Sequence, residues 1–181
     1  MIKAYARITL TALLSCFFAA THAQESVEVA FQYEGNANFG SVRPSLGIAE
    51  FTDSRDVDNA ALIADGYVAE APLAAIVQDA FAQAFTSSGV DLVASGEDML
   101  IAGDISDATL ETVDRGGVQS LQLTIRTRIQ LQDGGRTIYE TYLFGRGTVP
   151  VEEGVAAAVH ASLNRMISDL ARDNYFTLEL Q

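Results

Sequence analysis

Between Ser120 and Gln132 the chain alternates strictly between a mostly apolar set of residues and a polar set. In an extended chain the side chains of the first set point to one side, and those of the polar set point to the opposite side. A helix with 3.6 residues per turn would scatter both sets around its circumference. The segment therefore predicts a strand with one buried face and one open face. The buried set is Leu121, Leu123, Ile125, Thr127, Ile129 and Leu131, and the polar set is Gln122, Thr124, Arg126, Arg128, Gln130 and Gln132.

Similar patterns predict further strands, separated by turn residues. Residues 137–147 carry large side chains on both faces, which predicts a central strand. Residues 57–71 fit a loop with either a short strand or a helical turn. The other predicted strands are 26–33, 45–52, 91–94 and 99–113, the last with an irregularity at 103–107.

Two stretches have helical periodicity. Pro72 suits a first helical position, apolar residues follow on one face as far as Phe85, and Gly89 is expected to end this helix. A second apolar stripe runs from Val151 to about Arg172. Because each helix has one stripe to bury, the expected fold class is α+β, a mainly antiparallel sheet of about five strands with two amphipathic helices packed on one face.

The first 23 residues have the features of a secretory signal peptide. Basic residues precede the apolar run 8–20, and small residues precede a predicted cleavage after Ala23. This run is shorter than the roughly 20 residues that cross a bilayer. We expect a signal peptide at 1–23, a single domain at 24–181 and a periplasmic location. Alternatively, Cys16 follows a lipobox-like Leu13-Leu14-Ser15 and is a candidate lipidation site, which would anchor the protein to the outer membrane.

Removal of the signal leaves 181 − 23 = 158 residues with 9 Arg, no Lys, no Cys and 24 acidic residues, a formal charge of −15. Such an acidic chain is not expected to bind nucleic acid, and it is expected to meet a membrane only if Cys16 is lipidated. It has no thiol for disulfides or catalysis.

No residue pattern predicts catalysis or a cofactor. His160 is the one histidine after residue 23, so no histidine pair for a metal is available. Asp53, Asp56 and Asp58 lack the glycine and glutamate of a calcium loop. The acids at 97, 98, 104 and 107 have no motif that brings them together as a catalytic pair. We therefore expect a protein without enzymatic activity, cofactor or metal.

Four arginines have candidate roles. Arg55 lies between acids and is expected to clamp the second strand to the following helix. Arg126 and Arg128 lie on the polar face of the 120–132 strand, and Arg146 on its neighbour could join them. These three form a candidate partner-binding face for an acidic protein or for an anionic glycan or lipid headgroup. Alternatively, cross-strand acids such as Glu140 neutralise them.

From Pro44 onward the chain resembles the YajG-like family of bacterial envelope lipoproteins. The resemblance is carried by P-S-L-G-I-A-E-F-T-D-S-R-D, F-T-S-S-G, D-M-L-I-A-G-D-I-S-D-A, L-Q-L-T-I-R-T-R-I-Q-L and A-V-H-A-S-L-N-R-M-I-S-D-L-A-R-D-N-Y-F. It implies a small envelope domain and no defined site. A wider likeness in element order exists to curli-secretion and penicillin-binding-protein-activator lipoproteins.

The expected function is an interaction or adaptor module for an envelope protein or a cell-wall component. The alternative is a periplasmic carrier of a small apolar or amphipathic ligand, suggested by Phe81, Phe85, Tyr142 and Phe144 on elements expected to face each other.

Overall fold

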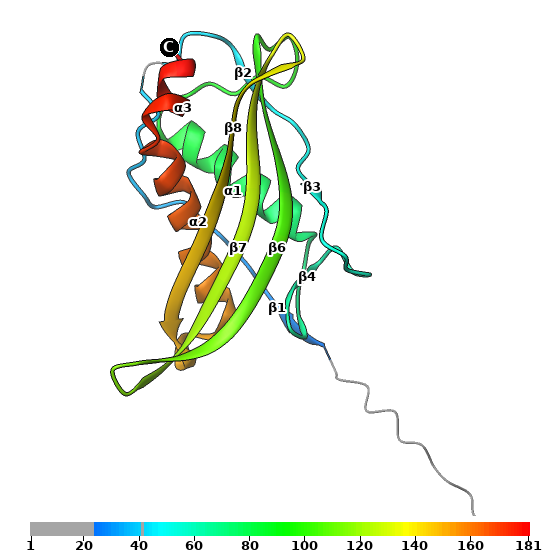
Figure 1. Ribbon diagram of the computed structural model, residues 1–181, viewed down its shortest axis with the longest axis vertical. Helices are drawn as coiled ribbons and strands as arrows, with labels where there is room; N and C mark the ends of the chain where they lie inside the picture. Colours follow the sequence, from blue (N-terminus) through cyan, green and yellow to red (C-terminus); the bar gives the residue numbers. More distant parts are fainter. Residues whose placement is uncertain (1–23, 41) are drawn as a thin grey trace, which may run out of the picture.

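The computed structural model describes residues 24–40 and 42–181, which form two sheets and three helices (Figure 1). The predicted signal cleavage site and the candidate lipidation site Cys16 lie outside these residues. The strands are β1 (Glu25–Val27), β2 (Leu46–Ile48), β3 (Thr52–Asp53), β4 (Leu62–Ala64), β5 (Tyr67–Ala69), β6 (Met99–Arg115), β7 (Val118–Asp133) and β8 (Arg136–Pro150). The α-helices are α1 (Leu73–Ser87), α2 (Gly154–Ala171) and α3 (Asn174–Glu179), and a short 3-10 turn, η1 (Val151–Glu153), precedes α2.

The larger sheet has the order β2-β6-β7-β8, and β3 also pairs with β6. The meander β6-β7-β8 is antiparallel, whereas β2 and β3 run parallel to β6. The predicted irregularity in β6 is confirmed as a shift in register between Ile105 and Asp107. β8 lies at the edge of this sheet, so the prediction of a central strand at 137–147 is wrong. Its large outward side chains Tyr142 and Phe144 are exposed to solvent instead of covered.

The predicted strand 45–52 is divided into β2 and β3. Between them the ring of Phe51 packs over Gly103, where any Cβ atom would collide with it. The backbone N–H of Phe51 donates to Oε1 of Gln78 on α1 at 3.1 Å. The pairing with β6 is therefore interrupted between β2 and β3, because the side chain of Phe51 turns into the core.

The smaller sheet, β1-β5-β4, contains only the start of the strand predicted at 26–33. Residues 28–33 of the predicted strand form no strand, although Val29 and Phe31 are buried as the alternation predicted. Backbone N–H groups here bond to side chains: Val29 donates to Glu70 at 2.9 Å and Tyr33 donates to Gln83 at 2.9 Å. Residues 28–33 therefore form a segment fastened to α1 and the turn before it by side chains.

α1 and α2 lie on the same face of the larger sheet, confirming the predicted α+β layering (Figure 1). α1 ends with Gly89 at φ +82°, which is the left-handed conformation expected there. The core between the layers contains Phe81 and Phe85 of α1 together with alternate residues of β7, and Phe39 stacks on Phe85 with ring centroids 4.1 Å apart.

The C-terminal helix α3 was not predicted. Asp173 caps its start, because its carboxylate accepts hydrogen bonds from the backbone N–H groups of Tyr175 at 2.9 Å and Phe176 at 3.2 Å. Phe176 inserts into the core beside Phe39 and Phe85. Among the helices of the described residues, none is long and apolar enough to cross a membrane.

Candidate functional site

The face of the larger sheet turned away from α1 and α2 carries the three predicted binding arginines. Arg126 and Arg128 alternate along β7 with buried residues, and Arg146 lies directly opposite Thr124 on β8. Side chains on opposite residues of neighbouring strands share one face, so the sheet brings Arg126, Arg128 and Arg146 to the same surface. We call this surface the open face.

At the centre of the open face the guanidinium of Arg126 lies against two aromatic rings. Its Cζ atom is 4.7 Å from the ring centroid of Tyr142 and 5.4 Å from that of Phe144. Both distances suit a cation–π contact, which contributes about 0.5–1 kcal/mol at an exposed site. Tyr142 is 44% exposed and Phe144 is 52% exposed. We call Arg126, Tyr142 and Phe144 the arginine–aromatic patch.

Arg128 differs from Arg126, because it has an acidic partner on β6, although Tyr142 lies opposite it on β8. Its Nη2 atom lies 3.8 Å from Oδ2 of Asp104, a long ion pair. That carboxylate also accepts hydrogen bonds from the hydroxyls of Thr52 at 2.7 Å and Ser54 at 2.8 Å. Asp104 thus fastens β3 to β6 and neutralises part of Arg128. No described carboxylate forms an ion pair with Arg126.

Glu140 does not neutralise the arginines in the expected way. It lies opposite Gln130, and the Gln130 amide donates to its Oε2 atom at 2.6 Å. The acid is therefore placed one cross-strand row beyond Arg128. Asp107 of β6 lies opposite Arg126 without forming an ion pair with it, so Arg126 is a cationic side chain without an ion-pair partner among the described residues, on a chain whose formal charge is −13.

Arg146 lines a hollow at the edge of β8 with a volume of about 480 Å³, which adjoins the arginine–aromatic patch at Phe144. Its other lining residues come from the end of β6, from β8 and from α2, and they are Arg115, Phe144, Thr148, Arg165 and Asp169. Three arginines thus line one hollow. We call it the β8-edge hollow.

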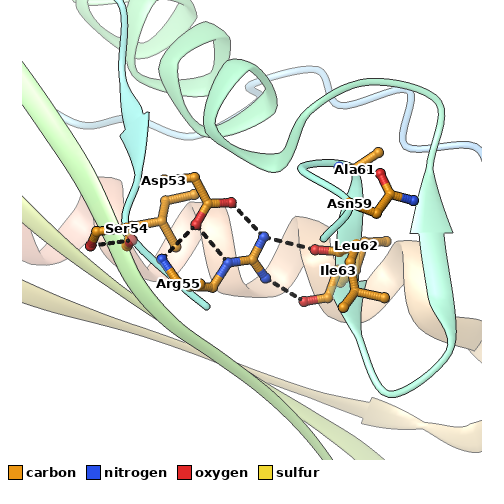
Figure 2. A network of polar contacts seen from close by, with 8 residues as sticks. Asp53, Ser54, Arg55, Asn59, Ala61, Leu62 and Ile63 are labelled. Carbon is orange, nitrogen blue, oxygen red and sulfur yellow. Dashed lines mark hydrogen bonds and ion pairs between the residues drawn. The ribbon is translucent and has the colours of Figure 1, made fainter. Parts of the chain in front are cut away.

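Arg55 makes the buried clamp shown in Figure 2, but to a different element from the one predicted. Its Nε and Nη2 atoms donate to the two oxygens of Asp53 at 2.9 and 2.6 Å. The remaining hydrogen bonds go to the backbone carbonyls of Ile63 at 3.0 Å and Leu62 at 2.8 Å on β4. The clamp therefore fastens the end of β3 to the β4–β5 hairpin and not to α1, because the segment 57–71 folds back beside it.

The ion pair leaves neither residue free for a ligand. The Arg55 and Asp53 side chains are 6% and 11% exposed, and both carboxylate oxygens of Asp53 bond to Arg55. Asp53 is thus unavailable to a cation with Asp56 and Asp58. In the described part of the chain, no group of three or more His, Cys, Asp and Glu side chains is placed to hold a metal ion.

Two of the other acids considered for catalysis, Asp98 and Asp104, accept local hydrogen bonds. The carboxylate of Asp98 accepts from both the backbone N–H and the hydroxyl of Ser45 at 2.9 Å. The backbone bond is the main cause that lowers the pKa of Asp98, and the hydroxyl adds to it. Asp104 bonds to Thr52 and Ser54, whereas Asp107 lies opposite Arg126. These acids therefore do not gather as a general acid and base in one pocket.

His160 lies on α2 with its ring edge-on to Phe31, at a centroid distance of 5.4 Å. Its Nε2 atom is buried without a hydrogen-bond partner among the described residues. Burial lowers the pKa of His160 below the usual 6.5, because the charged form loses hydration. The position is that of a packing residue.

The four aromatic residues considered for an apolar ligand do not share a cavity. Phe81 and Phe85 are fully buried in the core under α1, whereas Tyr142 and Phe144 are exposed on the open face. The sheet separates the two pairs.

The sequence interpretation missed the exposure of Tyr142 and Phe144 and the roles of Arg115 and Arg165. The sequence did contain a signal for the exposure of these aromatic residues, because Gly145 and Gly147 alternate with Phe144 and Arg146. Glycines on one side of a strand indicate a close approach by another element, which leaves the large residues on the other side. Arg165 is distant in sequence, and only the packing of α2 brings it to β8.

Comparisons with known proteins identify the fold. No family model and no curated protein matches the chain. A crystal structure of a Xanthomonas campestris protein of family DUF330 is similar, with a TM-score of 0.65 and 17% identity over 85% of this chain and 96% of that one. A hypothetical protein from Chlamydia trachomatis has a TM-score of 0.51 and 11% identity over 76% of this chain and 99% of that one.

A minor lipoprotein from Acinetobacter baumannii is more distant, with a TM-score of 0.36 and 14% identity over 72% of this chain and 90% of that one. The specific resemblance to the YajG-like family is not confirmed. The chain has the same α+β fold as the Xanthomonas DUF330 protein, and bacterial lipoproteins occur among its more distant structural neighbours.

Proposed function

We propose that the protein is a non-enzymatic binding module of the bacterial cell envelope that docks another envelope protein or a cell-wall component on its arginine–aromatic patch. The observation that carries this proposal is the guanidinium of Arg126 held against two exposed aromatic rings on an otherwise acidic molecule. Arginine and aromatic residues supply much of the binding energy at protein interfaces. An acidic partner surface with an apolar contact would complement the patch in both charge and hydrophobicity.

The proposed envelope location is supported by the amino-terminal sequence. The signal-like segment 1–23 would export the chain, with cleavage after Ala23 or, alternatively, acylation at Cys16. Mass spectrometry of the mature N-terminus separates these outcomes. A terminus at Gln24 supports a free periplasmic protein, a diacylglyceryl group at Cys16 supports an anchored one, and an intact Met1 contradicts export.

A photo-crosslinking amino acid placed at Phe144 in the full chain in intact cells tests the docking function. We expect a discrete cross-linked partner that disappears when Arg126→Glu is added. The same amino acid at Tyr175, which is 78% exposed on α3, is the matched control for an exposed aromatic position off the patch. Identical products from both positions, or products unaffected by Arg126→Glu, contradict the proposal.

A carboxylate-directed cross-linker gives an independent measurement, because the segment after residue 23 contains no lysine for ordinary amine reagents. Here Arg136→Gln serves as the control for removing an exposed charge from β8 outside the patch. Loss of the same partner with Arg126→Glu and its retention with Arg136→Gln is the expected result.

A further inference from the structure

The β8-edge hollow gathers positive charge from three separate elements. Arg115 ends β6, Arg146 lies on β8, and Arg165 extends from α2. The mature segment has only nine arginines and no lysine, so three at one hollow are a third of its basic residues. Phe144 forms an apolar wall beside them.

Most of this charge is not neutralised within the described residues. Arg165 pairs with Asp169 on the next turn of α2, Nε to Oδ2 at 2.8 Å, and both side chains stay accessible at 57% and 30%. Arg115 donates to the neutral amide oxygen of Gln122 at 3.2 Å. Three arginines and one aspartate give a formal local charge of 3 − 1 = +2.

This charge and these donors define the chemistry of a ligand. A guanidinium presents parallel N–H donors that fit two oxygens of a phosphate or carboxylate. A phosphate monoester carries about −1.5 to −2 at neutral pH, whereas a single carboxylate carries −1. The phosphate monoester therefore matches the local charge with one group.

We propose that the β8-edge hollow binds a phosphate monoester, with Arg115, Arg146 and Arg165 contacting the phosphate oxygens and Phe144 contacting the carbon skeleton attached to it. The phosphate belongs either to a soluble phosphorylated compound or to a lipid headgroup. This site goes beyond the docking function, because it depends on Arg115 and Arg165, which lie outside the arginine–aromatic patch.

The test follows the Nε–Hε signals of arginine by NMR while glycerol 3-phosphate is added at constant ionic strength, with chloride as the reference anion. We expect saturable shifts of the Arg115, Arg146 and Arg165 signals. Binding should weaken as pH falls below about 6, where the phosphate takes up its second proton. Absent shifts, or shifts of equal size for exposed arginines elsewhere, would overturn the proposal.

Variants make the test specific. Arg146→Gln and Arg115→Gln should each weaken glycerol 3-phosphate binding about tenfold, because each removes a charge-assisted hydrogen bond. Arg136→Gln, at the other end of β8, should leave the affinity unchanged. An equal loss with Arg136→Gln shows binding by net charge alone and overturns the site. All three positions are exposed, and thermal unfolding of each variant verifies that the fold is intact.

A vesicle arm separates the two sources of phosphate. Co-sedimentation with phosphatidic acid vesicles but not with pure phosphatidylcholine vesicles, lost in Arg146→Gln, supports the lipid source. Binding of glycerol 3-phosphate without co-sedimentation supports the soluble source. Poly-glutamate that shifts the same arginine signals when glycerol 3-phosphate does not would assign the hollow to an acidic protein segment and overturn the proposal.

Discussion

The two faces of β8 carry opposite kinds of side chain. Under α2 the strand presents Gly145 and Gly147, whereas on the open face it presents Tyr142 and Phe144. A Cβ atom at Gly145 would lie 2.6 Å from Cγ of Met166 and 2.7 Å from the carbonyl oxygen of Ser162. The Ser162 hydroxyl in turn donates to the carbonyls of Gly145 and, at 3.3 Å, of Leu123.

The two faces of β8 thus differ in role: the covered face contributes to stability, and the open face is available for binding. On the covered face the backbone of β8 approaches the backbone of α2, so small residues are required there. On the open face the large aromatic residues fill no cavity among the residues that the structure describes. Their retained exposure is what makes a surface available to a partner.

The largest effect is expected on the covered face, from Gly147→Ala. The new methyl group would collide with the backbone of α2 at Ala158 and Ser162, and backbone atoms cannot move aside as a side chain can. Overpacking of this kind costs about 1–3 kcal/mol, to be measured by denaturant unfolding. Thr148→Ala, on the next residue and opposite face, is the control and should change stability by less than about 0.5 kcal/mol. If Gly147→Ala and Thr148→Ala have the same free energy of unfolding, the backbone of α2 does not approach Gly147 closely enough to collide with a methyl group.

A second change on the covered face should stabilise the protein. Thr127 is fully buried in β7, and its hydroxyl has no hydrogen-bond partner among the described residues. Thr127→Val keeps the shape and removes the unpaired hydroxyl, so we expect a gain of about 1 kcal/mol in unfolding free energy. Thr124→Val on the open face should give a smaller change. A loss of stability at Thr127 would reveal a bound water or another partner for the hydroxyl.

The open face should tolerate truncation of its aromatic residues. Tyr142→Ser with Phe144→Ser removes the cation–π contacts of Arg126 but no core packing, so the loss should be below about 1 kcal/mol. Thermal unfolding measures this loss of stability, with Tyr175→Ser as the control variant. A loss of several kcal/mol would show that Tyr142 and Phe144 stabilise the folded protein, which would contradict the difference proposed between the two faces.

The smallest effect is restricted to a range of pH. Burial lowers the pKa of folded His160 below its usual 6.5, so the unfolded chain takes up the proton first as pH falls. The contribution of His160 is therefore present above about pH 6.5 and is lost as pH falls below it. His160→Gln should flatten the fall in stability between about pH 7 and 5, above the range where ordinary carboxylates titrate. An unchanged slope would show that His160 titrates normally.

Local patterns allowed the core of the fold to be predicted. The alternation in 120–132 and the apolar stripes of the two long helices depend on neighbouring residues alone, and each gave the correct element. The α+β layering followed because these elements have one apolar side each. Boundaries set by turn residues, such as Gly89, were also correct within a few residues.

Features that depend on distant partners could not be predicted. The alternation at 26–33 correctly gave the buried residues Val29 and Phe31, but periodicity does not reveal whether backbone groups bond to a strand or to side chains such as Glu70 and Gln83. Likewise, the sequence around Arg55 indicated a clamp but not its acceptors, which are backbone carbonyls without any sequence signature.

The same limit applies to the candidate site. Arg126 and Arg128 share a face because of local alternation, so their common orientation was predictable. The contact of Arg126 with Tyr142 depends on the register between β7 and β8, and the position of Arg165 depends on how α2 packs. Neither is encoded in a short motif.

The Arg55 clamp also joins the two sheets. Its guanidinium is held by Asp53 at the end of β3, and β3 pairs in parallel with β6 of the larger sheet. The same guanidinium donates to the carbonyls of Ile63 and Leu62 on β4, which belongs to the smaller sheet together with β1. The segment that begins at Glu25 is therefore connected to the larger sheet through this one side chain as well as through its buried residues Val29 and Phe31.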